Sequence, residues 1–166
     1  TIEGNHADQG GALYIDADSN AALTRGWLYS NTATDGAGVL VQGGSVSMMN
    51  VGLLGNTAAG SGGGLAIEDG GSAILDWAVL SMNSAVEGGG AWAGGGSSLT
   101  LTSSIVSDNT GGGGLAGLSA TFSGTYNNVY NNLGGDYIGL TEPTDGTSIS
   151  ADPMFTAAAI PGDWHL

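Results

Sequence analysis

The chain has 166 residues, which is enough for a single domain. Fifteen acidic residues face a single basic one, Arg25, and the net charge of −14 argues against binding to nucleic acid or to an anionic membrane surface. The chain has no cysteine and no apolar run long enough to cross a membrane as a helix, so the sequence predicts neither disulfides nor membrane insertion.

One asparagine recurs along the chain at nearly constant spacing. The intervals between consecutive copies are 26, 25, 27, 26 and 23 residues. A repeat of this length indicates a solenoid or a related repeat architecture. The recurring residues are Asn5, Asn31, Asn56, Asn83, Asn109 and Asn132.

Short β-strands are expected at fixed distances from each asparagine. In chain order, the strands that follow the glycine clusters are 13–15, 39–41, 65–67 and 91–93, with their outer members facing a core. Apolar residues also lie ten, eight and three positions before the asparagines. Period-two alternation of this kind is typical of strands with one buried face, and the glycine pairs argue against helices.

These patterns predict an all-β fold, a right-handed parallel β-helix of about 5–6 coils. Residues 1–132 form the coils, and residues 133–166 are an irregular capping segment of the same domain. The asparagines are expected to point inward at one corner and to bond backbone groups and one another as a structural ladder. The alternative is that each asparagine is a surface turn residue. Because the chain begins at Thr1 inside a repeat, we expect a processed piece of a longer precursor.

Two motifs resemble known repeat proteins. Each coil has an aliphatic residue three positions before the asparagine and a Gly-Gly-small-apolar segment after it. This resembles the right-handed β-helix repeats of the pectin-lyase-like superfamily, and most of all those of the chlamydial polymorphic outer-membrane proteins. Those repeats carry Phe where this chain has Leu or Val. The segments 152–155 and 162–166 are similar to the ending of such proteins. The resemblance implies export and a cell-surface or extracellular location, and it implies no single enzyme activity.

The surface offers two groups of candidate residues. The middle residues of the post-glycine strands are expected to form an outward apolar stripe, Tyr14, Leu40 and Trp92, with Ala66 and Ala116 between and beyond them. Four acidic residues are weak candidates for calcium: Asp16, Asp18, Glu68 and Asp69. The sequence assigns no cofactor and no other metal ligand.

Two functions from different classes follow. The first is a non-catalytic structural or adhesive surface module, which self-associates or meets a surface partner and stacks head-to-tail into filaments through open strand edges. The alternative is a carbohydrate-binding or polysaccharide-cleaving protein. Asp35 and Glu87 share a register two coils apart and could serve as a carboxylate pair, but scattered acids more often keep a surface soluble. With Arg25 as the single base, a lyase that neutralises an acidic sugar is disfavoured. We assign no catalytic residue.

Overall fold

The computed structural model describes residues 1–144 and 146–155, which form β-strands and no α-helix. A nine-stranded sheet contains β1 (Ile2–Glu3), β3 (Asn20–Tyr29), β6 (Ser45–Leu54), β9 (Ser72–Asp76), β10 (Val79–Ser81), β13 (Ser98–Thr102), β14 (Ile105–Ser107), β17 (Thr121–Thr125) and β18 (Asn128–Tyr130). A four-stranded sheet contains β4 (Thr32–Ala33), β7 (Thr57–Ala58), β11 (Ser84–Ala85) and β15 (Thr110–Gly111). A six-stranded sheet contains β2 (Leu13–Ile15), β5 (Val39–Gln42), β8 (Leu65–Glu68), β12 (Ala91–Gly94), β16 (Leu115–Leu118) and β19 (Tyr137–Ile138).

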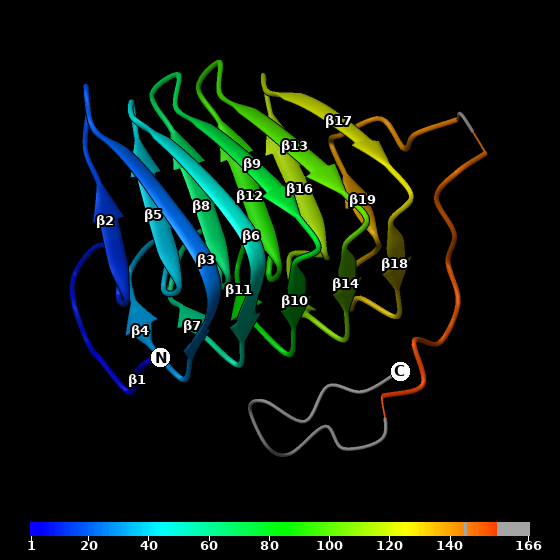
Figure 1. The fold of residues 1–166 in the computed structure, drawn as a ribbon, viewed down its shortest axis with the longest axis horizontal. Helices are drawn as coiled ribbons and strands as arrows, with labels where there is room; N and C mark the ends of the chain where they lie inside the picture. Colours follow the sequence, from blue (N-terminus) through cyan, green and yellow to red (C-terminus); the bar gives the residue numbers. More distant parts are fainter. Residues whose placement is uncertain (145, 156–166) are drawn as a thin grey trace.

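Each strand pairs with the equivalent strand of the next coil, and all the pairings between these strands are parallel. The result is a parallel β-solenoid of about 5 turns, whose coils follow one another along a single axis (Figure 1). The chain is therefore all-β, as the repeat predicts.

The apolar residues three positions before the asparagines form a column along the axis. Leu28 lies beside Leu53, Leu53 beside Leu80, and Leu80 beside Val106 in the strand register. Leu53 and Leu80 are completely buried. Burying each such leucine side chain stabilises the fold by roughly 1.5–3 kcal/mol. The predicted stacking of equivalent side chains is confirmed.

The post-glycine strands supply the other wall of the core. Val39 and Val41 of β5 and Leu65 and Ile67 of β8 are fully buried in the same apolar cluster as the leucine column. In β9 the burial alternates along the strand, with Leu75 inside and Ile74 outside. The alternation read from the sequence therefore identifies the inward faces correctly.

Glycines occupy two kinds of position that a side chain would disrupt. Gly36 has φ +59°, and a Cβ there would come within 2.6 Å of the Leu40 Cβ. Gly64 lies in the stack itself, where a Cβ would approach the carbonyl oxygen of Gly90 to 2.5 Å. The first glycine provides a tight turn and the second allows consecutive coils to approach closely.

The segment after residue 132 continues the stacking in part. β19 adds to the six-stranded sheet, because Leu115 pairs with Tyr137 and Ala116 with Ile138. Ile149 forms an isolated parallel bridge with Asn128. The segment predicted as irregular thus contains one strand of the solenoid. Residues 162–166 of the ending motif lie outside the described residues.

Candidate functional site

The six recurrent asparagines form a continuous hydrogen-bonded ladder along one corner of the solenoid. Each Nδ2 donates to the Oδ1 of the asparagine in the next coil, at 2.8–3.0 Å from Asn5 through to Asn132. Each backbone N–H donates to the same Oδ1 atom, at 2.9–3.1 Å. Every Oδ1 after the first therefore accepts two bonds from the coil before it.

From Asn31 to Asn132, the second hydrogen of each amide satisfies a carbonyl group of the column of apolar residues. Asn56 Nδ2 donates to Leu28 O at 2.9 Å, and Asn83 Nδ2 donates to Leu53 O at 2.8 Å. The same bond recurs in the other coils. The four asparagines from Asn31 to Asn109 have no exposed surface. Burial makes these bonds necessary, since an unpaired buried amide is costly. The ladder predicted from the repeat is thus present, and the surface-turn alternative does not hold for these residues.

The ladder ends at a carboxylate. Asp136 Oδ1 accepts from the backbone N–H of Asn132 at 3.2 Å and from its Nδ2 at 2.8 Å. Asp136 therefore takes the acceptor position that an asparagine fills in every earlier coil. A carboxylate has no amide hydrogens to pass on, so the hydrogen-bond sequence stops there.

A second turn of the coil, between the two halves of the nine-stranded sheet, has its own polar support; a single short strand, such as β10, separates it from the asparagine corner. The backbone N–H of Ala78 donates to Ser104 Oγ at 2.9 Å, and the backbone N–H of Ser104 donates to Asn127 Oδ1 at 3.0 Å. Asn127 Nδ2 donates to Leu101 O at 2.8 Å. These buried bonds hold three consecutive turns in one conformation.

The predicted outward stripe is wrong at Leu40. Tyr14 is 44% exposed and Trp92 is partly buried, but Leu40 is completely buried, and so is Ala66. The glycine turn lies over the outer face of the six-stranded sheet at both Tyr14 and Leu40, but Leu40 is also flanked on both sides, by Tyr14 and Ala66 of the adjacent coils. Tyr14 and Trp92 therefore do not belong to one continuous apolar surface.

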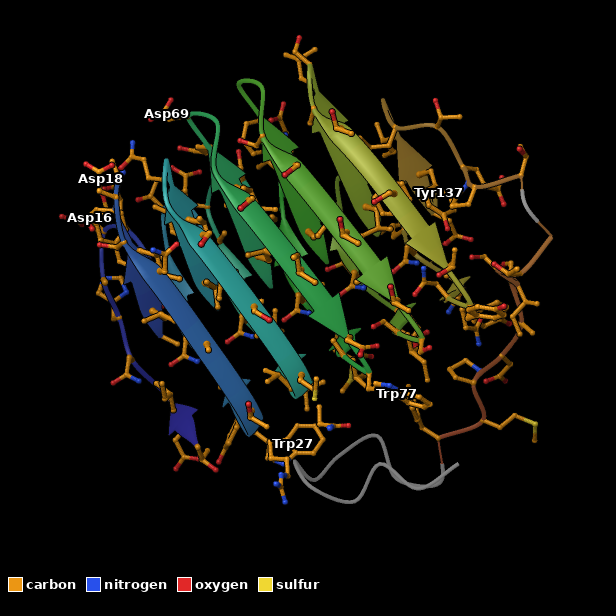
Figure 2. The ribbon with its side chains drawn as sticks, turned by 45° about the horizontal axis from the view of Figure 1, so that its top comes forward. Asp16, Asp18, Trp27, Asp69, Trp77 and Tyr137 are labelled. Carbon is orange, nitrogen blue, oxygen red and sulfur yellow. The ribbon has the colours of Figure 1, made fainter. Side chains whose placement is uncertain are left out.

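The calcium candidates are only partly brought together. Asp16 and Asp69 line an open groove of about 360 Å³ that also contains Gln42, and Figure 2 shows them with Asp18 at one rim of the solenoid. Glu68 does not line this groove. Within the described residues, no group of three or more His, Asp or Glu side chains is placed to hold a metal ion. Calcium binding stays a prediction.

Several acids make structural hydrogen bonds. Asp35 Oδ1 accepts from the backbone N–H of Ser61 at 2.7 Å, so one member of the predicted pair with Glu87 bonds the neighbouring coil. Asp69 Oδ2 accepts from Gln42 Nε2 at 3.0 Å. Burial raises the pKa of Glu68, and the charges of Asp35 and Asp69 raise it further.

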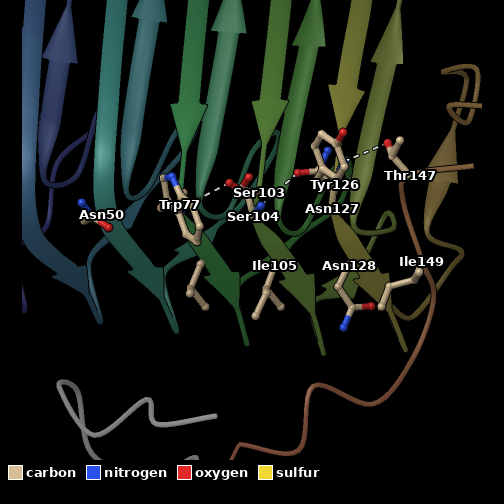
Figure 3. Close-up of a pocket in the computed structure, with 12 residues that line it drawn as sticks. Asn50, Trp77, Ser103, Ser104, Ile105, Tyr126, Asn127, Asn128, Thr147 and Ile149 are labelled. Carbon is tan, nitrogen blue, oxygen red and sulfur yellow. Dashed lines mark hydrogen bonds between the residues drawn. The ribbon is translucent and has the colours of Figure 1, made fainter. Parts of the chain in front are cut away.

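A row of left-handed residues marks the turn between the two halves of the nine-stranded sheet. They have φ between 50° and 57° and point away from the core; we call them the corner row: Arg25, Asn50, Trp77, Ser103 and Tyr126. Trp77 is 62% exposed and Tyr126 is 67% exposed. An open groove of about 580 Å³ lies beside the last four of them (Figure 3). Its floor includes Val79, Ile105 and Asn128.

This groove was not predicted from the sequence, although the repeat contains its signal. Each corner-row residue lies six positions before a ladder asparagine, in five successive coils. Aligning the coils at that position gives a basic residue, an amide, an indole, a hydroxyl and a phenol. Two aromatic residues at a position that is polar in the other three coils were the available signal.

Comparison with protein-family models, with curated proteins and with solved structures finds no match to this chain. No helix among the described residues combines the length and apolarity that a bilayer span requires.

Proposed function

We propose that this chain is a non-catalytic structural or adhesive β-solenoid module of an extracellular or cell-surface protein. Its repeat resembles that of the pectin-lyase-like superfamily and of chlamydial polymorphic outer-membrane proteins. The observation that carries the proposal is the asparagine ladder, which runs without interruption from Asn5 to Asn132. A regular rod held by repeated axial bonds is suited to displaying a surface.

The use of the acidic side chains supports the same function. Asp35, Asp69 and Asp136 bond backbone or amide groups of neighbouring residues. A glycosidase instead needs two carboxyl groups that face one substrate. The polar chemistry of this chain is directed along the axis and favours a scaffold over a catalyst.

Localisation and activity test the proposal. Antibodies against the chain should label intact cells that produce the full protein, and deleting the gene should reduce attachment of those cells to surfaces. Purified protein should release no reducing sugar from xylan, β-glucan or polygalacturonate, with or without calcium. Release that disappears in Asp35→Asn or Glu87→Gln would overturn the proposal in favour of an enzyme.

Self-association is a further expectation of the scaffold function. Because Asp136 occupies the last acceptor position of the ladder, head-to-tail stacking would require another copy to meet the C-terminal segment rather than an open asparagine. Electron microscopy and light scattering of concentrated protein test this, and filaments are the expected result. Protein that remains monomeric at every concentration would contradict it.

A further inference from the structure

The groove beside Trp77 and Tyr126 is built differently from the rest of the surface. A bulky aromatic residue with positive φ is uncommon, and such conformations often accompany function. Asn and Gly tolerate this conformation better, and Asn50 uses it at the equivalent turn. The solenoid therefore places two aromatic side chains where neither its core nor its backbone requires them.

The two rings are presented on a rigid support. Trp77 directly precedes Ala78, and Tyr126 directly precedes Asn127, so both adjoin the buried network through Ser104. The backbone N–H of Tyr126 also donates to Thr147 Oγ1 at 3.0 Å. Figure 3 shows the indole and the phenol on either side of Ser103 and Ser104, above Ile105. A surface held in this way loses little conformational entropy when a ligand binds.

The spacing of the rings is set by the solenoid. Trp77 and Tyr126 are two coils apart with Ser103 between them, which corresponds to about 10 Å, twice the strand spacing of about 4.8 Å. One coil is close to the length of one pyranose unit in an extended glycan. In a β-1,4-linked chain, alternate units present the same face, so every second unit can meet a ring.

The charge of the groove points to a neutral ligand. Although the chain carries a net charge of −14, none of the described residues that line the groove is acidic or basic. The lining combines exposed aromatic faces with the amide of Asn50 and the hydroxyl of Ser103, whereas the amide of Asn128 is already bonded to the backbone of Ala151. Apolar faces beside hydroxyl and amide groups suit a sugar ring, which has an apolar face and a polar rim.

We propose that this groove binds an extended, neutral, β-1,4-linked polysaccharide. One pyranose ring stacks on Trp77, a second, two units along, stacks on Tyr126, and Asn50 and Ser103 bond the hydroxyl groups. This ligand would be bound by the proposed scaffold, and failure to bind it would leave the scaffold function, which surface labelling tests, in place.

Affinity electrophoresis tests the site with defined probes. Native gels contain hydroxyethylcellulose, xyloglucan or glucomannan as neutral β-1,4-linked chains, amylose as an α-linked chain, and polygalacturonate as an acidic chain. At least one neutral β-1,4-linked polysaccharide should retard the protein. Amylose and polygalacturonate should leave its migration unchanged. Retardation by none of the neutral chains, or by amylose or polygalacturonate alone, would overturn the proposal.

Variants then locate the binding surface. Trp77→Asn and Tyr126→Asn remove the rings and keep a residue type that the same turn already accommodates at Asn50. Each should weaken retention about tenfold or more, a change of about 1.4 kcal/mol. Leu118→Ala is the matched control, because Leu118 is 71% exposed and lies on the six-stranded sheet. Circular dichroism confirms that each variant is folded. Wild-type retention in both asparagine variants, or equal loss in the Leu118 variant, would contradict the site.

Discussion

Asn132 donates two hydrogen bonds to one carboxylate oxygen of Asp136, from its backbone nitrogen at 3.2 Å and its side-chain amide at 2.8 Å. The same pair of bonds joins every earlier asparagine to the next one. Asp136 therefore completes the ladder with a carboxylate oxygen that accepts the same two bonds as the Oδ1 of an asparagine. Its second oxygen accepts from Ser150 Oγ at 3.4 Å, so the C-terminal segment is tied to the end of the ladder.

Removing this acceptor should destabilise the last coil. In Asp136→Ala, the backbone N–H of the nearly buried Asn132 loses its partner, its side-chain amide keeps only Val106 O and Tyr130 O, and the free energy of unfolding should fall by roughly 1–3 kcal/mol. Asp136→Asn keeps an acceptor and should lose less. Denaturant unfolding followed by circular dichroism measures both variants. Asp8→Ala, which removes an exposed carboxylate, is the control, and an equal effect in that variant would contradict the role of Asp136.

An asparagine in the middle of the ladder should contribute more to the free energy of unfolding than the asparagine at its start. Asn56 donates three bonds, its Oδ1 accepts two, and it is fully buried, whereas Asn5 is exposed and donates two to Asn31. Asn56→Ala should lower the free energy of unfolding by roughly 1–3 kcal/mol for each buried group left unpaired. Asn5→Ala should cost distinctly less. Equal costs in denaturant unfolding would mean that the interior bonds add nothing.

The sequence was sufficient to predict the stacking and the ladder because both repeat with the coil. A residue such as Leu53 contacts its equivalents in adjacent coils, so its environment follows from the period alone. The amide of Asn83 bonds other copies of itself for the same reason. Interactions between equivalent positions can be read from one repeat.

Interactions between different positions of a coil could not be read in this way. Leu40 is buried on the outer face of its strand, between its own glycine turn and the flanking residues Tyr14 and Ala66, and neither strand alternation nor period reveals this arrangement. The groove between Trp77 and Tyr126 lies at a turn that no glycine marks in the sequence. The corner-row residues adopt the left-handed backbone of this turn without being glycine, so the turn could not be located from the glycine pattern. Asp136 lies 4 rather than 23–27 residues after the preceding ladder residue, so it falls outside the period.

Truncating a residue of the buried leucine column should destabilise the fold more than truncating a nearby exposed aliphatic residue. Leu80 is completely buried, and Ile74 is 54% exposed. Leu80→Ala should lower the free energy of unfolding by about 2–5 kcal/mol through lost burial and an internal cavity. Ile74→Ala, the control, should change it by much less. Thermal and denaturant unfolding of both variants test this, and similar losses would show that Leu80 does not face a packed core.

Glu68 provides a stability change that depends on pH. Burial, followed by the charges of Asp35 and Asp69, raises its pKa above the ordinary value of 4.5, so the folded state disfavours the ionised carboxylate. The favourable contribution of the protonated form is complete below pH 4.5 and is lost as the pH rises through the raised value. Glu68→Gln should therefore raise the melting temperature at pH 7. The gain should shrink toward pH 4. Glu87→Gln, at an exposed position, controls for the loss of one negative charge. A gain that is independent of pH would point to a cause other than ionisation.

The raised pKa of Tyr137 predicts that the folded state loses stability at high pH. Burial and the charges of Glu142 and Asp136 raise the pKa of its phenol to about 12 from an ordinary value of 10.0, and its ring packs against Phe122 with centroids 5.9 Å apart. Between these two values the unfolded chain has lost the phenol proton while the folded chain still holds it. Stability is therefore intact below pH 10 and falls as the pH rises toward 12. In Tyr137→Phe, denaturant unfolding at pH 8, 10 and 11 should show a shallower fall than in the wild type, and parallel falls would mean that Tyr137 ionises in the folded protein as readily as in the unfolded chain.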